Sequence, residues 1–236
     1  MTETSTNFGR LLVGTKDELY RHAAALVAAG PRVVAFSGGS TPQDWYRWCV
    51  QTRALTPVGV ARTHFTVSDE RCVPLTDPLS NFGHADRLLL EPLGVPADHR
   101  HPWAVGLAPA TAAAEYGTTI PELAGQGRSY DLCFLGLGDD SHTASLFPGS
   151  PLLLDDHGGW FAPVEVPGKG WRLTITPTGL QACGSVVVLA PGAGKAEALR
   201  RVLQGPSDPV NVPAQILRTC AEHVTWLVDE AAAAAL

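Results

Sequence analysis

The chain has 236 residues, of which 45% are hydrophobic and 17% are charged, a composition that suits a globular core and excludes wholesale disorder. Its formal net charge of −6 provides no global basic field, so nucleic acid and anionic membranes are not expected as partners. The N-terminus lacks the basic-then-apolar order of a signal peptide, and no apolar run approaches the roughly 20 residues needed to cross a bilayer.

Strand-like apolar runs alternate with helical segments through the first half of the chain. Thr15 and Glu18 have the spacing of a capping box, which predicts a helix that continues to residue 29. A second helix is predicted from about Pro42, where proline is accepted in the first turn. Further elements are predicted as strands at 32–36, 64–67 and 131–137, a long loop at 68–81 and a helix at 108–123.

The same alternation continues to the C-terminus. Strands are predicted at 172–176, 185–190 and 224–228, with helices at 195–203 and in the alanine-rich tail. Continuous apolar strands separated by helices are typical of a parallel sheet that is covered on both faces. We therefore predict an α/β fold with a single doubly wound, mainly parallel sheet and helices on both faces, Rossmann-like, in one domain over residues 1–236.

In such folds ligands bind at the carboxyl ends of the strands, and a glycine-rich segment follows the first predicted strand. Free backbone N–H groups at the start of the next helix favour an anion there. The bland alternative is an ordinary turn between a strand and a helix. The candidate phosphate-binding residues in this segment are Ser37, Gly38, Gly39, Ser40 and Thr41.

Charged side chains follow the second predicted strand. Asp69 and Arg71 combine a carboxylate suited to sugar hydroxyls with a guanidinium whose fork matches phosphate oxygens. A surface ion pair without function is the alternative interpretation. Two further cations are candidate phosphate ligands, Lys195 behind a glycine-rich turn and Arg172 at the start of a strand.

The third candidate segment contains a histidine after a glycine-rich turn. His142 is a candidate general base near neutral pH. Asp140, two residues earlier, is a candidate to orient its imidazole, and a structural role in capping the turn is the alternative. The preceding G-x-G is not a dinucleotide fingerprint, because Ser141 occupies the place of the third glycine.

The motifs SGGSTP, DERxVP with SN downstream, GLGxDxHTASLFPG, RLTIT and GxGK occur here in one order. This ordered set resembles the 6-phosphogluconolactonases, over about residues 32–228. The resemblance implies hydrolysis of 6-phospho-D-glucono-1,5-lactone to 6-phosphogluconate in the oxidative pentose phosphate pathway, with no metal and no cofactor. It implies His142 as the base that activates water, Asp140 as its orienting group, and Asp69 as a contact to sugar hydroxyls or to the water.

The chain departs from the usual family pattern within the histidine turn. Asp139 stands where the family has proline, and Ser141 stands where it has glycine. If that glycine has positive φ in relatives, we expect Ser141 to cost about 1 kcal/mol. If the Asp139 carboxylate points inward, we expect it to raise the pKa of His142.

Two alternatives to the lactonase interpretation remain open. The related glucosamine-6-phosphate isomerase/deaminase places a glutamate five residues after the histidine, and here that position is Phe147. A sugar-phosphate sensor would carry a helix-turn-helix before the fold, whereas about 30 residues, predicted to hold one helix, precede the first predicted strand.

The cysteines and the remaining histidines bear on compartment and metal binding. The five cysteines are dispersed and odd in number, which fits neither a disulfide framework nor zinc and predicts a reducing, cytoplasmic compartment. Cys133 is predicted to be a buried apolar side chain, and His99 and His101 are predicted to be solvent-exposed. A monomer or a weak dimer is expected.

Overall fold

A computed structural model describes residues 1–154 and 159–236 of the chain. Its main sheet has seven strands in the order β1-β2-β10-β9-β6-β3-β4. The β1–β2 pair is antiparallel, and all other neighbours in this sheet are parallel, so the predicted fold class is confirmed. The strands are β1 (Thr2–Thr6), β2 (Gly9–Val13), β3 (Val33–Phe36), β4 (His64–Val67), β6 (Leu132–Leu135), β9 (Val186–Leu189) and β10 (Val224–Val228).

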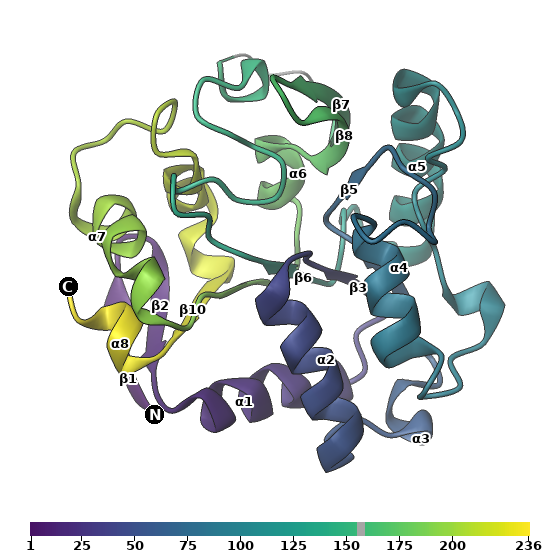
Figure 1. Ribbon diagram of the computed structural model, residues 1–236, viewed down its shortest axis with the longest axis horizontal. Helices are drawn as coiled ribbons and strands as arrows, with labels where there is room; N and C mark the ends of the chain where they lie inside the picture. The colour runs from purple at the N-terminus through teal and green to yellow at the C-terminus, as the bar shows by residue number, and fades with distance from the viewer. Residues whose placement is uncertain (155–158) are drawn as a thin grey trace.

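Helices cover both faces of this sheet. In Figure 1 the parallel strands cross the middle of the view, with α1 and α2 below them and α6 above. No helix in the described ranges is both long enough and apolar enough to span a membrane. The α-helices are α1 (Lys16–Ala28), α2 (Ser40–Thr52), α3 (Pro57–Val60), α4 (Asn81–Ala85), α5 (Pro109–Ala124), α6 (Pro177–Gln181), α7 (Ala196–Gln204) and α8 (Glu230–Ala233).

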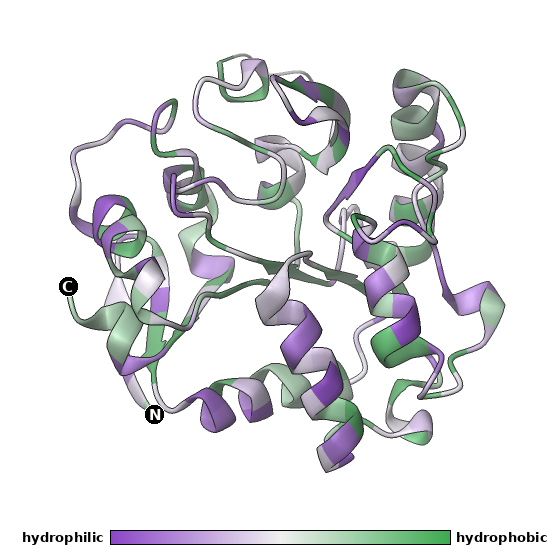
Figure 2. Ribbon diagram, viewed as in Figure 1, coloured by the Kyte–Doolittle hydropathy of each residue, from purple (hydrophilic) through white to green (hydrophobic). Residues whose placement is uncertain are grey.

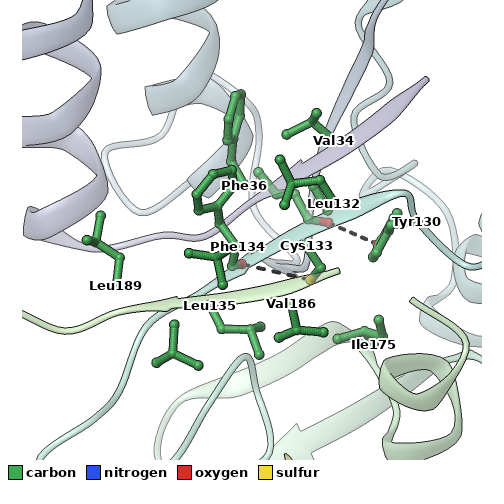
Figure 3. Close-up of a cluster of buried hydrophobic side chains, with 14 of the residues drawn as sticks. Val34, Phe36, Tyr130, Leu132, Cys133, Phe134, Leu135, Ile175, Val186 and Leu189 are labelled. Carbon is green, nitrogen blue, oxygen red and sulfur yellow. Dashed lines mark hydrogen bonds between the residues drawn. The ribbon is translucent and has the colours of Figure 1, made fainter. Parts of the chain in front are cut away.

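The core extends over both faces of the central strands, and one part of it lies between these strands and α2. Hydropathy is highest along these strands, whereas α1 and α2 carry hydrophilic residues on their outer sides (Figure 2). Phe36 of β3 stacks on Phe65 of β4 with ring centroids 5.5 Å apart, and it meets Trp45 of α2 edge-on. Cys133 of β6 belongs to the same buried hydrophobic core (Figure 3), and burial raises the pKa of its thiol well above the usual value. The prediction of a buried, apolar Cys133 is confirmed.

The sequence-based assignment missed several short elements. The N-terminal residues form the hairpin of β1 and β2 before α1, and β2 pairs with β10 more than 200 residues away, a tertiary pairing that local patterns do not reveal. The predicted loop at 68–81 contains a short strand, β5 (Asp69–Arg71). Together with β8 (Gly170–Ile175) and β7 (Phe161–Val166), β5 forms a separate antiparallel sheet, which was also not predicted.

The strand order determines where a cleft can form. From β3 the chain proceeds to β4 on one side and later returns to β6 on the other side of β3. The connections that leave β3 and β6 therefore diverge at this point, which opens a crevice at the carboxyl ends of the two strands. The segments that follow these ends are residues 37–41 and 136–142.

Three histidines gather at the opposite, N-terminal end of β4. The His64 ring lies 4.3 Å from that of His99 and 5.0 Å from that of His101, and His64 Nδ1 is 2.8 Å from His101 Nε2. All three side chains are partly buried, so the prediction that His99 and His101 are solvent-exposed is wrong. Burial, followed by the charges of the neighbouring histidines, lowers the pKa of both His64 and His101.

This cluster predicts acid sensitivity of the fold. The unfolded chain takes up protons at the ordinary histidine pKa of about 6.5, whereas folded His64 and His101 do so only at lower pH. The unfolded state therefore binds more protons in this window, and the contribution of the cluster to the free energy of unfolding is lost as pH falls from 6.5 through the folded pKa values. We expect a loss of about 1 kcal/mol between pH 6.5 and 5, and a smaller loss in His101→Gln, measured by urea unfolding. Parallel curves for the wild type and this variant would contradict the assignment, and His223→Gln, outside the cluster, is the control.

Candidate active site

A cleft of about 230 Å³ lies at the crevice between β3 and β6. It brings together segments that are separated by more than 150 residues in the sequence. Its lining contains nine of the sequence-predicted site residues, namely Ser37, Gly38, Gly39, Ser40, Thr41, Asp69, Arg71, His142 and Lys195. Asp140 and Arg172 do not line it.

The segment from Ser37 to Thr41 runs along the start of α2, which begins two residues earlier than predicted. Gly39 is the N-cap residue with φ of 101°, a conformation that glycine adopts without steric cost. Gly38 is required for a different reason, because a Cβ at this position would overlap the side-chain oxygen of Asn81. The backbone can therefore approach a ligand closely while the N–H groups of the first helical turn remain available to an anion.

Asp69 is buried at the floor of the cleft and held from two sides. The Ser145 hydroxyl donates a hydrogen bond of 2.7 Å to Asp69 Oδ2, and the Asn81 amide donates to the Asp69 carbonyl at 2.8 Å. The Asn81 side-chain oxygen is buried without a hydrogen-bond partner, although Asn81 also lines the cleft. Sequence reasoning noted the Ser80-Asn81 pair but did not include Asn81 among the site residues.

Glu70, between the two candidate residues, is fully buried. Its carboxylate accepts hydrogen bonds from the backbone N–H groups of Arg71, Asn81 and Phe82 and from the Ser80 hydroxyl, at 2.8–3.0 Å. Burial raises its pKa, although these hydrogen bonds act in the opposite direction. Glu70 therefore ties β5 to the start of α4 and was missed as an organising residue.

Arg71 and Arg172 are directly opposite one another in the β5–β8 ladder. Arg71 donates to the carbonyl of Leu79 and lines the cleft. Burial and the charge of Arg71 lower the pKa of Arg172. Two neighbouring guanidinium groups repel each other, so an anion bound between them would be stabilised.

His142 and Asp140 form a close pair in the turn after β6. His142 Nδ1 is 2.5 Å from Asp140 Oδ1, and the His142 backbone N–H donates to the same oxygen at 3.1 Å. Desolvation would raise the pKa of Asp140, but these two contacts from His142 prevail and lower it. Because Asp140 occupies Nδ1, Nε2 is the ring nitrogen of His142 that remains available to a ligand.

The surroundings of His142 also fix its ring. Phe147 stacks on the imidazole with centroids 4.2 Å apart. Gly138 lies so close to the ring that a Cβ at this position would overlap Nδ1, and its N–H donates to the His142 carbonyl at 2.8 Å. The ring is thus held by a carboxylate, an aromatic face and a glycine turn.

The structure shows the surroundings of Ser141 and Asp139, the two residues of this turn that differ from the usual family pattern. Ser141 has φ of 66°, as expected if the family glycine has positive φ, and its hydroxyl is buried without a partner. The Asp139 carboxylate contacts Lys195 Nζ at 2.7 Å and does not contact His142. Among the residues that the structure describes, no group of three or more His, Cys, Asp or Glu side chains is arranged to hold a metal ion.

Comparison with known proteins gives consistent matches over nearly the whole chain. The sequence matches the family described as glucosamine-6-phosphate isomerases/6-phosphogluconolactonase over residues 13–226. A 6-phosphogluconolactonase of Synechocystis sp. is 33% identical, with 90% of this chain and 88% of the relative covered. A 6-phosphogluconolactonase of Mycobacterium tuberculosis is 31% identical, with coverage of 90% and 88%. The solved structure of 6-phosphogluconolactonase from Trypanosoma cruzi has a TM-score of 0.80 at 28% identity, with 100% of this chain and 98% of that chain covered.

The geometry of Ser141 predicts a stabilising substitution. Ser141→Gly removes both a positive-φ side chain and a buried, unpartnered hydroxyl, so we expect the free energy of unfolding to rise by about 1–2 kcal/mol. Urea unfolding measures this change. The matched control is Ala144→Gly, which relieves a φ of 47° without removing a hydroxyl and should give a smaller gain. An equal or lower stability of Ser141→Gly than of the wild type would contradict this account.

Proposed function

This chain belongs to the glucosamine-6-phosphate isomerase/6-phosphogluconolactonase family, and we propose that it hydrolyses 6-phospho-D-glucono-1,5-lactone to 6-phosphogluconate. One observation carries the proposal: His142, with Nδ1 held by Asp140, lines the same cleft as the start of α2 and the cations Arg71 and Lys195. A base and an anion site are thereby presented to one ligand. This arrangement suits a substrate that is phosphorylated at one end and reactive at the other.

The phosphate serves as the handle. The N–H groups at the start of α2 and the hydroxyls of Ser37, Ser40 and Thr41 supply donors, and Arg71 adds a charged fork. Lys195 contributes a second cation, and Arg172, opposite Arg71 on the neighbouring strand, adds a further positive charge near the phosphate. Fixing the phosphate in this way places C1 against His142, and a misplacement of about 1 Å would cost roughly 10²-fold in rate.

The chemistry follows from one base and one water. Neutral His142 accepts a proton on Nε2 as the water oxygen bonds to C1, which gives a tetrahedral intermediate. The imidazolium then donates that proton to the ring oxygen as the bond between C1 and this oxygen breaks. Asp140 keeps the Nδ1 proton in place and stabilises the imidazolium, and Asp69 binds sugar hydroxyls or the water.

Phe147 separates this reaction from the isomerisation and deamination of glucosamine 6-phosphate. The related isomerases place a carboxylate at this position, whereas here an aromatic ring stacks on the imidazole. The phenyl ring of Phe147 packs against the imidazole of His142 but cannot transfer a proton. The sister reaction therefore lacks its third ionisable group in this cleft.

The setting of the reaction is part of the proposal. We propose that the protein acts in the cytoplasm, in the oxidative pentose phosphate pathway, as a monomer or a weak dimer in one domain. The five cysteines are free thiols, and four of them are buried, which supports a reducing compartment.

The role of His142 is tested by turnover. We expect His142→Ala to lower kcat by about 10²–10⁴-fold, because the general base is lost, with KM changed little. The measurement is the initial rate of 6-phosphogluconate formation from freshly generated lactone, corrected for spontaneous hydrolysis. Wild-type protein that does not accelerate hydrolysis would overturn the proposed function, and a fully active His142→Ala would overturn the mechanism.

The role of Arg71 is tested by binding. Removal of a charged fork from the phosphate should raise KM by roughly 10- to 100-fold in Arg71→Ala, with a smaller effect on kcat. Arg172→Ala is the matched comparison, since Arg172 lies beside Arg71 but outside the cleft lining, and it should raise KM less. Equal KM values for wild type and Arg71→Ala would show that the phosphate binds elsewhere.

A further inference from the structure

An ion pair spans the rim of the cleft at the phosphate end. Lys195 Nζ lies 2.7 Å from Asp139 Oδ1. Lys195 belongs to the short helical turn Ala193–Lys195 after β9, and Asp139 belongs to the turn after β6. Because β6 and β9 are adjacent parallel strands, the topology brings these two turns together at the same edge of the sheet.

The two partners differ in their surroundings. The Lys195 side chain is 28% exposed and lines the cleft, whereas that of Asp139 is 82% exposed and does not line it. Asp139 therefore approaches the lysine from the solvent side. A phosphate in the cleft would contact the same ammonium group from the inside.

We propose that Asp139 sets the affinity of the cleft for phosphate-bearing ligands by holding and partly neutralising Lys195. This inference rests on the proposed function, in which Lys195 is a phosphate ligand. An ammonium group has three donors, so it can bind Asp139 and the phosphate at once. The carboxylate then lies close to a dianion and repels it, which lowers affinity without blocking the site.

The effect of Asp139 is confined to binding by the local geometry. The neighbouring Asp140 carboxylate contacts His142 Nδ1, whereas the Asp139 carboxylate contacts Lys195. Asp140 therefore acts on the base, and Asp139 acts on the cation that binds the phosphate. Removal of the Asp139 charge changes the surroundings of Lys195, which binds the phosphate, and leaves the contact between Asp140 and His142 intact. Asp139 also acts only on ligands that carry phosphate, so it reduces the preference of the cleft for phosphorylated over unphosphorylated ligands.

The magnitude follows from the position of the pair at the rim. The charge of Asp139 is largely solvated and screened by salt. We expect Asp139→Asn to tighten binding of 6-phosphogluconate by about 3- to 10-fold at low ionic strength, less at high salt. The affinity for D-gluconate and the kcat for the lactone should stay within about twofold.

The experiment is calorimetric titration of wild type, Asp139→Asn, Lys195→Ala and the double variant with 6-phosphogluconate, inorganic phosphate and D-gluconate. Tighter binding of both phosphate ligands in Asp139→Asn, and a clearly smaller gain from this substitution in the Lys195→Ala background, is the expected result. Unchanged or weaker binding in Asp139→Asn would overturn the proposal, as would an equal gain for D-gluconate.

A charge control and an activity control complete the design. Glu115→Gln removes the same charge from the exposed outer side of α5, so an equal gain in this variant would show a general field effect and overturn the role of Asp139. Titration does not depend on turnover. A protein that binds phosphate ligands as expected but does not hydrolyse the lactone would therefore contradict the proposed function alone.

Discussion

The buried carboxylate of Glu70 holds together the part of the molecule on which the cleft depends. Burial of a carboxylate is costly unless its lone pairs are filled, and here three backbone N–H groups and one hydroxyl fill them. Successive side chains of a strand point to opposite sides. With Glu70 directed into the protein, Asp69 and Arg71 are directed together to the other side, where both line the cleft.

The other parts of the site are positioned by contacts that begin at Glu70. Glu70 sets the start of α4, and Asn81 at that start meets both the Asp69 carbonyl and Gly38. β5 and residues 37–41 are thereby placed against one another. On the far side of β3, the turn after β6 supplies His142 on a ring that is clamped by Asp140 and Phe147. The strand order makes these independent turns converge, because the crevice opens where the chain changes direction across β3.

Much of this was predictable from the sequence, and the failures have physical reasons. Apolar runs in the sequence predict the buried parallel strands β3, β4, β6, β9 and β10. The polar residues that follow these strands mark the sheet edge at which ligands bind. The capping box at Thr15 is likewise local and is found as predicted. β2 and β5 are short strands whose partners β10 and β8 are distant in the sequence, so local patterns do not reveal them. β5 also consists only of the charged residues Asp69, Glu70 and Arg71.

Side-chain partners were harder to predict than positions. That Asp139 contacts Lys195 rather than His142 depends on how two turns approach in space, and no spacing in the sequence encodes it. The same holds for Asn81 and Glu70, whose roles appear only when α4 is set against β5. The roles of Asp140, Asp69 and Arg172 in the reaction remain predictions, and Arg172 lies outside the cleft lining in this structure.

The central claim is that one cleft holds the phosphate at the start of α2 and presents C1 to His142. A crystal structure of the complex with 6-phosphogluconate tests this most directly. We predict the phosphate on residues 37–41 with Arg71 and Lys195, and C1 within about 4 Å of His142 Nε2, close to the separation needed for reaction. A phosphate bound elsewhere, or a C1 directed away from His142, would contradict the account.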